Sequence, residues 1–126
     1  MSFLEIQIKS NFALVTIKRP EALNALNDVV ITEIGAMVDE LESNSSVRGF
    51  ILTGEGKAFV AGADIAKMKE FNVREGQAFS ELGQTVFRKM ELSGLISIAA
   101  INGFVWVGEW NLLWHVISVM RLLLLN

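Results

Sequence analysis

The sequence predicts an α/β fold in which strands and helices alternate after an opening hairpin. The stretch Phe3–Lys9 alternates apolar with polar residues, Phe12–Lys18 is apolar and β-branched, and Ser10-Asn11 lies between them. That pattern indicates two antiparallel strands joined by a tight turn. Further along, strand-like runs alternate with segments of helical periodicity, which is typical of parallel strands joined by crossover helices.

The individual elements follow from local patterns. A helix is expected from Asn27 or Asp28 to about Glu42, where a run of serines and an asparagine, residues 43–46, stops it. The later elements expected in chain order are a strand at Arg48–Thr53, a short helix at Asp64–Phe71 with Asp64 as N-cap, a long amphipathic helix at Gly76–Ser93 and a strand at Ser97–Ile101. The core-facing helical positions are Val30, Ile34, Met37, Val38 and Leu41, and then Phe79, Leu82, Val86, Phe87 and Met90.

Composition narrows the class of protein. A length of 126 residues suits one small domain with a core, and a formal charge of −3 provides no basic stripe, so nucleic acid is not an expected partner. The absence of cysteine leaves no disulfide and no thiolate metal site, and no metal is expected. No secretory signal pattern opens the chain, so a cytoplasmic location is expected.

The last 22 residues, 105–126, differ from the rest of the chain. These 22 residues contain all three tryptophans, and their only charged residues are Glu109 and Arg121. A membrane-spanning helix needs about 20 predominantly apolar residues. Polar and charged residues, among them Asn111 and His115, interrupt this tail, so no membrane span is expected.

The most informative segment is the glycine-rich loop Gly54–Ile65, which follows the strand Arg48–Thr53 and leads into the expected short helix. Glycine lets the backbone turn and lets a peptide N–H face a ligand closely. Such a loop before a helix N-terminus can present N–H groups to an anion or to a polarised carbonyl. An ordinary strand–turn–helix connection would show the same glycines, so the pattern by itself leaves both interpretations open.

Three segments together resemble the crotonase (enoyl-CoA hydratase/isomerase) family. They are the loop Gly54–Ile65, the stretch Arg19–Asn27 and the stretch Ala99–Phe104, in the family's order and at about its spacing. The resemblance covers residues 1–104 and implies the N-terminal portion of the crotonase spiral, a ββα superhelix, in truncated form. It also implies an acyl-CoA thioester as substrate, no cofactor, and a homo-oligomeric parent protein.

The family's chemistry requires N–H donors that face the thioester oxygen, because negative charge develops there when water adds to the double bond. Removing one such donor typically costs about 2.7–4 kcal/mol of transition-state stabilisation. The resemblance assigns the two backbone donors of this oxyanion hole to Ala61 and Gly108. It assigns contacts with coenzyme A or substrate to Ala61, Gly62, Ala63, Asp64, Ile65 and Lys57. For Lys57, which would neutralise phosphate, a solvated loop lysine is an equal alternative.

The family pattern fails after Phe104. Where the family continues with three glycines and then a catalytic glutamate, this chain has Gly108 at the middle glycine and Asn111 at the glutamate. A second glutamate of the family would lie beyond residue 126. We therefore assign no catalytic side chain in this sequence.

Back-translation explains the break as a frameshift. One coding string for the tail, regrouped from its third base, reads Leu-Gly-Gly-Gly-Met-Glu-Leu-Ala-Leu-Ala-Cys-Asp, which resembles the family. Because tryptophan has one codon, the pairs at Trp106, Trp110 and Trp114 force a Gly, a Glu and an Ala in that register. The chain then divides into a crotonase-like part, 1–104, and a frameshifted apolar tail, 105–126. The alternative is a diverged tail that forms a buried or partner-binding apolar helix.

The frameshift interpretation weakens the case for the polar residues of the tail as functional residues. His115, the single histidine, becomes a by-product of the shifted frame. Glu109 lies two positions before the expected glutamate, which on a helix is roughly 200° away around the axis. The run Leu122–Leu125 is an apolar patch that favours self-association.

We therefore expect a truncated crotonase-family chain whose intact parent hydrates trans-2-enoyl-CoA thioesters in fatty-acid or short-chain acyl-CoA metabolism. The chain as written is expected to be inactive, and isomerase and dehydratase directions stay open for the parent. Two alternatives from other classes are a non-catalytic CoA-binding or subunit-interaction fragment, and a small protein associated with membranes through its tail.

Overall fold

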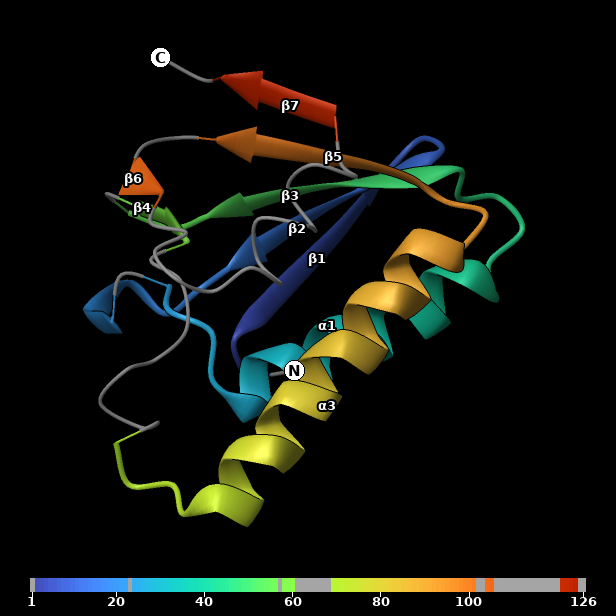
Figure 1. Cartoon of the computed structure of the whole chain (residues 1–126). Coiled ribbons are helices and arrows are strands. Elements are labelled where there is room, and N and C mark those ends of the chain that lie inside the picture. The colour runs from blue at the N-terminus through green and yellow to red at the C-terminus, as the bar shows by residue number, and fades with distance from the viewer. Residues whose placement is uncertain are drawn as a thin grey trace.

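The main sheet is built from five strands and is covered on one face by two helices (Figure 1). The computed structural model describes residues 2–22, 24–56, 58–60, 69–101, 104–105 and 121–124, and the statements below concern these. In chain order the elements are β1 (Leu4–Lys9), β2 (Phe12–Ile17), the 3-10 turn η1 (Pro20–Ala22), α1 (Asp28–Glu42), β3 (Gly49–Gly54), β4 (Ala58–Val60), α3 (Val73–Leu92), β5 (Ile96–Ile101), β6 (Phe104–Val105) and β7 (Arg121–Leu124). The order in the main sheet is β1-β2-β3-β5-β7, and β4 pairs with β6 in a second, two-stranded sheet.

The opening hairpin is confirmed. β1 and β2 pair antiparallel with Lys9 opposite Phe12, so that Ser10 and Asn11 are the two residues of the turn. Ser10 has φ 61°, and two-residue hairpin turns require such left-handed backbone because it matches the twist of the strands. Both strands begin and end within one residue of the predicted bounds.

The parallel crossover units that follow the hairpin are also confirmed. β2 pairs with β3, and β3 pairs with β5, in parallel. α1 connects the first pair, while β4 and α3 lie between the second pair in sequence. The carboxyl ends of β2, β3 and β5 therefore meet at one edge of the sheet, which is where open α/β sheets bind their ligands.

Helix α1 starts where the sequence indicates. Asn27 is the N-cap, and its Oδ1 accepts a hydrogen bond from the Val30 N–H at 2.8 Å. This bond satisfies one of the backbone donors that a helix N-terminus leaves without a partner. The predicted apolar face is buried, and Ile31 and Gly35 are buried with it.

Helix α3 begins earlier than predicted, at Val73 rather than Gly76. The reason is a capping box: Asn72 Oδ1 accepts from the Glu75 N–H at 2.8 Å, and Glu75 Oε1 accepts from the Asn72 N–H at 3.3 Å. The Asn-x-x-Glu spacing is a sequence signal for a helix start, and the expectation of a start at Gly76 did not use it. The helix ends at Leu92, one residue before the predicted end.

The core lies between the helices and the face of the sheet that they cover. Alternate residues of β2, Ala13, Val15 and Ile17, are fully buried, as the period of two in a strand requires. Burial of an aliphatic or phenylalanine side chain contributes about 1.5–3 kcal/mol relative to exposure. The core-facing residues predicted for α3 are buried, except Leu82, which is partly buried against the core.

Three short strands were not predicted. β4, β6 and β7 contain two to four residues each, too few for a period to show. β6 includes Phe104 and Val105 and so spans the predicted boundary between residues 104 and 105. Of the short helix predicted at Asp64–Phe71, residues 64–68 lie outside the described residues. Its described end is not helical, because Lys69 and Glu70 form a turn and Phe71 has no regular structure.

Candidate functional site

The candidate site lies at the sheet edge where the carboxyl ends of β2, β3 and β5 meet. After β2 the chain enters the segment 18–27, after β3 it enters the glycine-rich loop, and after β5 it enters β6. The Glu55 N–H donates to the Ile17 carbonyl at 2.8 Å, so the pairing of β2 with β3 continues one residue past Gly54. The three segments that carry the family resemblance thus leave the sheet at the same edge.

The second sheet pairs the two strands that precede the expected oxyanion-hole donors in sequence. β4 and β6 pair in parallel, with Ala58 opposite Phe104 and Val60 opposite Val105. Ala61 follows Val60 directly, and Gly108 follows Val105 by three residues. The strands that precede these two expected donors, which are 47 positions apart in sequence, therefore lie side by side.

The predicted site residues themselves lie outside the described residues. These are Lys57, Ala61, Gly62, Ala63, Asp64, Ile65 and Gly108, together with the tail residues Glu109, Asn111 and His115. The structure describes the strands that flank them, and the roles assigned to them stay predictions.

The segment after β2 is fixed by a network of hydrogen bonds that sequence reasoning missed. Asn24 Oδ1 accepts from the Arg19 N–H at 2.9 Å, and Asn24 Nδ2 donates to the Glu55 carbonyl at 2.9 Å. Arg19 Nη1 donates to the Ala25 carbonyl at 2.7 Å, and its guanidinium lies 5.8 Å from the centre of the Phe3 ring. A polar residue between the apolar Leu23 and Ala25 was the available sequence signal.

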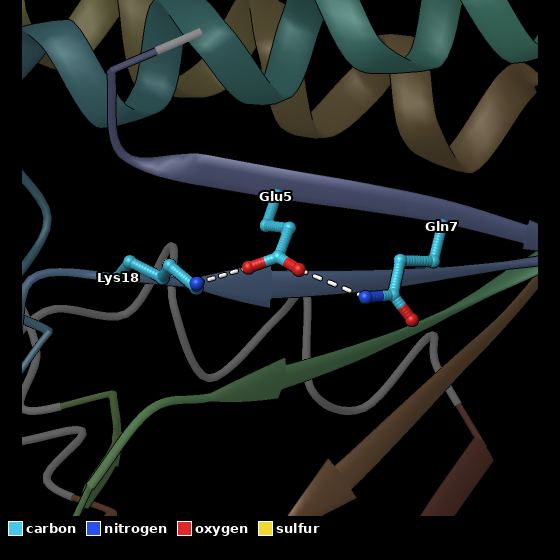
Figure 2. Close-up of polar contacts among 3 residues, drawn as sticks. All are labelled: Glu5, Gln7 and Lys18. Carbon is cyan, nitrogen blue, oxygen red and sulfur yellow. Dashed lines mark hydrogen bonds and ion pairs between the residues drawn. The ribbon is translucent and has the colours of Figure 1, made fainter.

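Charged side chains join β1 to the end of β2 next to this segment (Figure 2). Glu5 accepts from Lys18 in an ion pair and from Gln7 Nε2 at 2.8 Å. The hydrogen bond from Lys18, then that from Gln7, lowers the pKa of Glu5 below its ordinary 4.5. The hydrogen bond to Glu5 likewise raises the pKa of Lys18 above 10.5. Both side chains are well exposed, so this pair holds the strand ends without forming a buried charged site.

Within the part of the chain that the structure describes, no group of three or more His, Cys, Asp or Glu side chains could hold a metal ion. No helix among those same residues combines the length and the apolar character that crossing a membrane requires.

Comparison with known proteins identifies the protein family to which this chain belongs. The chain belongs to the enoyl-CoA hydratase/isomerase family, whose sequence model matches residues 7–115. The match extends beyond Phe104, where the residue-by-residue agreement with the family's motifs ends, and it includes Gly108. The suspected crotonase resemblance is thereby confirmed.

Individual relatives agree with this assignment. The chain is 50% identical over 100 residues to a short-chain-enoyl-CoA hydratase of Clostridium acetobutylicum, covering 79% of this chain and 38% of that protein. It is 41% identical over 108 residues to a crotonyl-CoA hydratase of Syntrophomonas wolfei, covering 85% of this chain and 42% of that protein. The chain spans about two fifths of the length of these curated relatives.

A solved structure shows the same fold. The enoyl-CoA hydratase of Bacillus anthracis superposes with a TM-score of 0.77 at 25% sequence identity, over 80% of this chain and 40% of the other. This similarity confirms the predicted fold class, the N-terminal part of the crotonase spiral.

Proposed function

We propose that the carboxyl edge formed by β2, β3 and β5 is an acyl-CoA site, and that the parent activity is hydration of trans-2-enoyl-CoA. The observation that carries this proposal is the parallel register of β4 and β6, with Val60 opposite Val105. Val60 directly precedes Ala61, and Val105 lies three residues before Gly108, so this pairing supports an assignment of two donors to one thioester oxygen. The family membership and the names of the two relatives, a short-chain-enoyl-CoA hydratase and a crotonyl-CoA hydratase, support the same substrate class.

The roles follow from the chemistry of the thioester. The N–H groups of Ala61 and Gly108 would stabilise the negative charge that develops on the thioester oxygen. The backbone from Ala61 to Ile65 would contact coenzyme A, and Lys57 would meet its phosphates. Addition of water also requires a general base and a general acid, which the family supplies as two glutamates.

The first of those two groups is missing from this chain, so we propose that it binds acyl-CoA weakly and does not hydrate enoyl-CoA at a useful rate. Asn111 stands at the position of the first glutamate, and an amide cannot accept a proton from water at neutral pH. Loss of a general acid or base typically lowers a rate by about 10²–10⁴-fold. Binding without turnover is also what the alternative of a non-catalytic CoA-binding fragment predicts.

Titration with butyryl-CoA tests the binding proposal directly, because a saturated thioester binds but cannot be hydrated. Calorimetry on the 126-residue protein should show saturable binding that is tighter than that of free coenzyme A, since free coenzyme A has no thioester oxygen. Ala61→Pro removes one N–H donor and should reduce the difference in affinity between butyryl-CoA and free coenzyme A. The control Gly76→Ala in α3 should preserve this difference. Equal heats for butyryl-CoA and buffer would contradict the proposal.

A second candidate role is subunit interaction, and the position of β7 favours it. Among the described strands, β7 is the last in the order of the main sheet and pairs on one side with β5. An edge strand with unpaired backbone groups can add a strand from another chain. We propose that the chain self-associates through the edge strand β7. Size-exclusion chromatography across a range of concentrations tests it, and a monomer at every concentration would contradict it.

A further inference from the structure

Asn24 is the one polar or charged side chain that is buried among the described residues, with an exposed fraction of 0%. Its backbone is in the left-handed region, with φ 58°, which asparagine tolerates better than most residues. An amide that is removed from water costs free energy unless its donors and acceptors find partners. What Asn24 binds therefore shows what the fold uses it for.

The two ends of the Asn24 amide bind different loops. Its Oδ1 accepts from the Arg19 N–H at 2.9 Å, within the segment that follows β2. Its Nδ2 donates to the Glu55 carbonyl at 2.9 Å, across 31 positions of sequence. Glu55 is the first residue after β3 and the second of the glycine-rich loop Gly54–Ile65. The side chain thus links the segment after β2 to the start of the loop that is assigned to the substrate.

The Asn24 side of this link is itself held in place. The Asn24 N–H donates to the Arg19 carbonyl at 2.8 Å, and Arg19 Nη1 donates to the Ala25 carbonyl at 2.7 Å. The Arg19 guanidinium lies over the Phe3 ring, 5.8 Å from its centre, which anchors the segment to the start of β1. A donor held this firmly can fix the carbonyl that it binds.

We propose that Asn24 is a positioning residue for the acyl-CoA site. By holding the Glu55 carbonyl, it fixes the place and direction in which the glycine-rich loop leaves the sheet. Donors to a developing oxyanion must be held within about 0.5 Å of the productive geometry. This inference rests on the proposed acyl-CoA site, and it adds a residue that touches neither the thioester nor coenzyme A.

The substitution Asn24→Asp keeps the hydrogen-bond acceptor of the side chain and removes its donor. A carboxylate still accepts from the Arg19 N–H, but it cannot donate to the Glu55 carbonyl. The measurements are the Kd for butyryl-CoA and amide hydrogen exchange of the 126-residue protein. We expect a Kd raised about tenfold, the equivalent of one lost hydrogen bond. We also expect faster amide exchange at residues 54–56 than in the unsubstituted chain. Exchange in α1 should change only as much as the global free energy of unfolding does.

Val38→Ala is the matched control. Val38 is fully buried in α1, and its truncation lowers stability without touching the loops at the carboxyl edge. It should lower Tm and leave the Kd for butyryl-CoA within twofold, which separates positioning from general destabilisation. If Val38→Ala weakens binding as much as Asn24→Asp at equal loss of Tm, the positioning role is overturned.

The other possible outcomes also test the positioning role of Asn24. Unchanged Kd and unchanged exchange at residues 54–56 in Asn24→Asp would overturn the inference. If Asn24→Asp does not fold, Asn24→Gly replaces it, since glycine accepts positive φ and removes the side chain with its hydrogen bonds. Folded Asn24→Gly with unchanged loop exchange would again overturn the inference. If the unsubstituted chain does not bind butyryl-CoA, the proposed function fails, and the exchange measurement alone then tests whether Asn24 fixes the loop.

Discussion

Gly49 is a residue at which the packing of the sheet is sensitive to one added methyl group. It begins β3 and lies between Phe12 of β2 and Ile96 of β5. A Cβ at this position would lie 2.3 Å from the Ile96 carbonyl oxygen and 2.9 Å from both Ile96 Cβ and Phe12 Cε2. The oxygen belongs to the backbone, so relief of the contact requires a shift of β5 relative to β3.

The expected cost of Gly49→Ala follows from that geometry. Overpacking in a well-packed interior typically costs about 1–3 kcal/mol, and a backbone neighbour that cannot rotate away places this case at the upper end. A loss of about 3 kcal/mol is a large part of the roughly 5–15 kcal/mol that stabilises a native domain. With about 4–8 °C of Tm per kcal/mol in domains of similar or smaller size, Tm should fall by roughly 10 °C or more.

Urea denaturation followed by circular dichroism measures this loss. The matched control is Gly76→Ala in α3, where an added Cβ meets nothing within 4 Å. There the same substitution should raise the free energy of unfolding by about 0.5–1 kcal/mol, because glycine weakens a helix relative to alanine. An unfolding midpoint for Gly49→Ala equal to that of the unsubstituted chain would refute the register that places Gly49 between Phe12 and Ile96.

Two further predictions concern the ends of elements. Asn27→Ala removes the side-chain acceptor for the Val30 N–H at the start of α1 and should cost about 1 kcal/mol in urea denaturation, and an unchanged midpoint would contradict the cap. Glu5→Gln tests the ion pair with Lys18 through pH: because the folded-state pKa of Glu5 lies below its ordinary 4.5, the pair's contribution is complete above that pH and is lost as pH falls through the folded value. The Glu5→Gln chain should therefore lose less stability below pH 4.5 than the unsubstituted chain, as Tm measured against pH would show, and parallel acid limbs would refute the assignment.

The fold could be predicted from sequence wherever its cause is local. The start of α1 at Asp28 and its buried face follow from a capping asparagine and a period of 3.6 residues, both visible in the residues themselves. The hairpin around Ser10-Asn11 is local in the same way. The earlier start of α3 was local too, through Asn72 and Glu75, and it was missed because the apolar period was followed without the cap.

The rest depends on contacts between distant segments. β4 has three residues and β6 has two, and each is defined by the other strand, more than forty positions away in sequence. The bond between Asn24 and Glu55 spans 31 positions, so no local pattern announces it. Of the candidate site, Ala61 and Gly108 came from the family resemblance. The structure adds the pairing of the strands that precede them in sequence and the buried amide that binds the start of the loop.

The central proposal is that this chain carries an acyl-CoA site in which Asn111 stands at the position of the first catalytic glutamate. The most direct test is the loss of enoyl thioester absorbance from crotonyl-CoA, measured with the purified 126-residue protein and with a version whose reading frame is restored after Phe104. We predict turnover by the restored version and a rate at least about 10²-fold lower for the chain as written. Comparable turnover by the two proteins would contradict the claim and would place the catalytic groups within the chain as written.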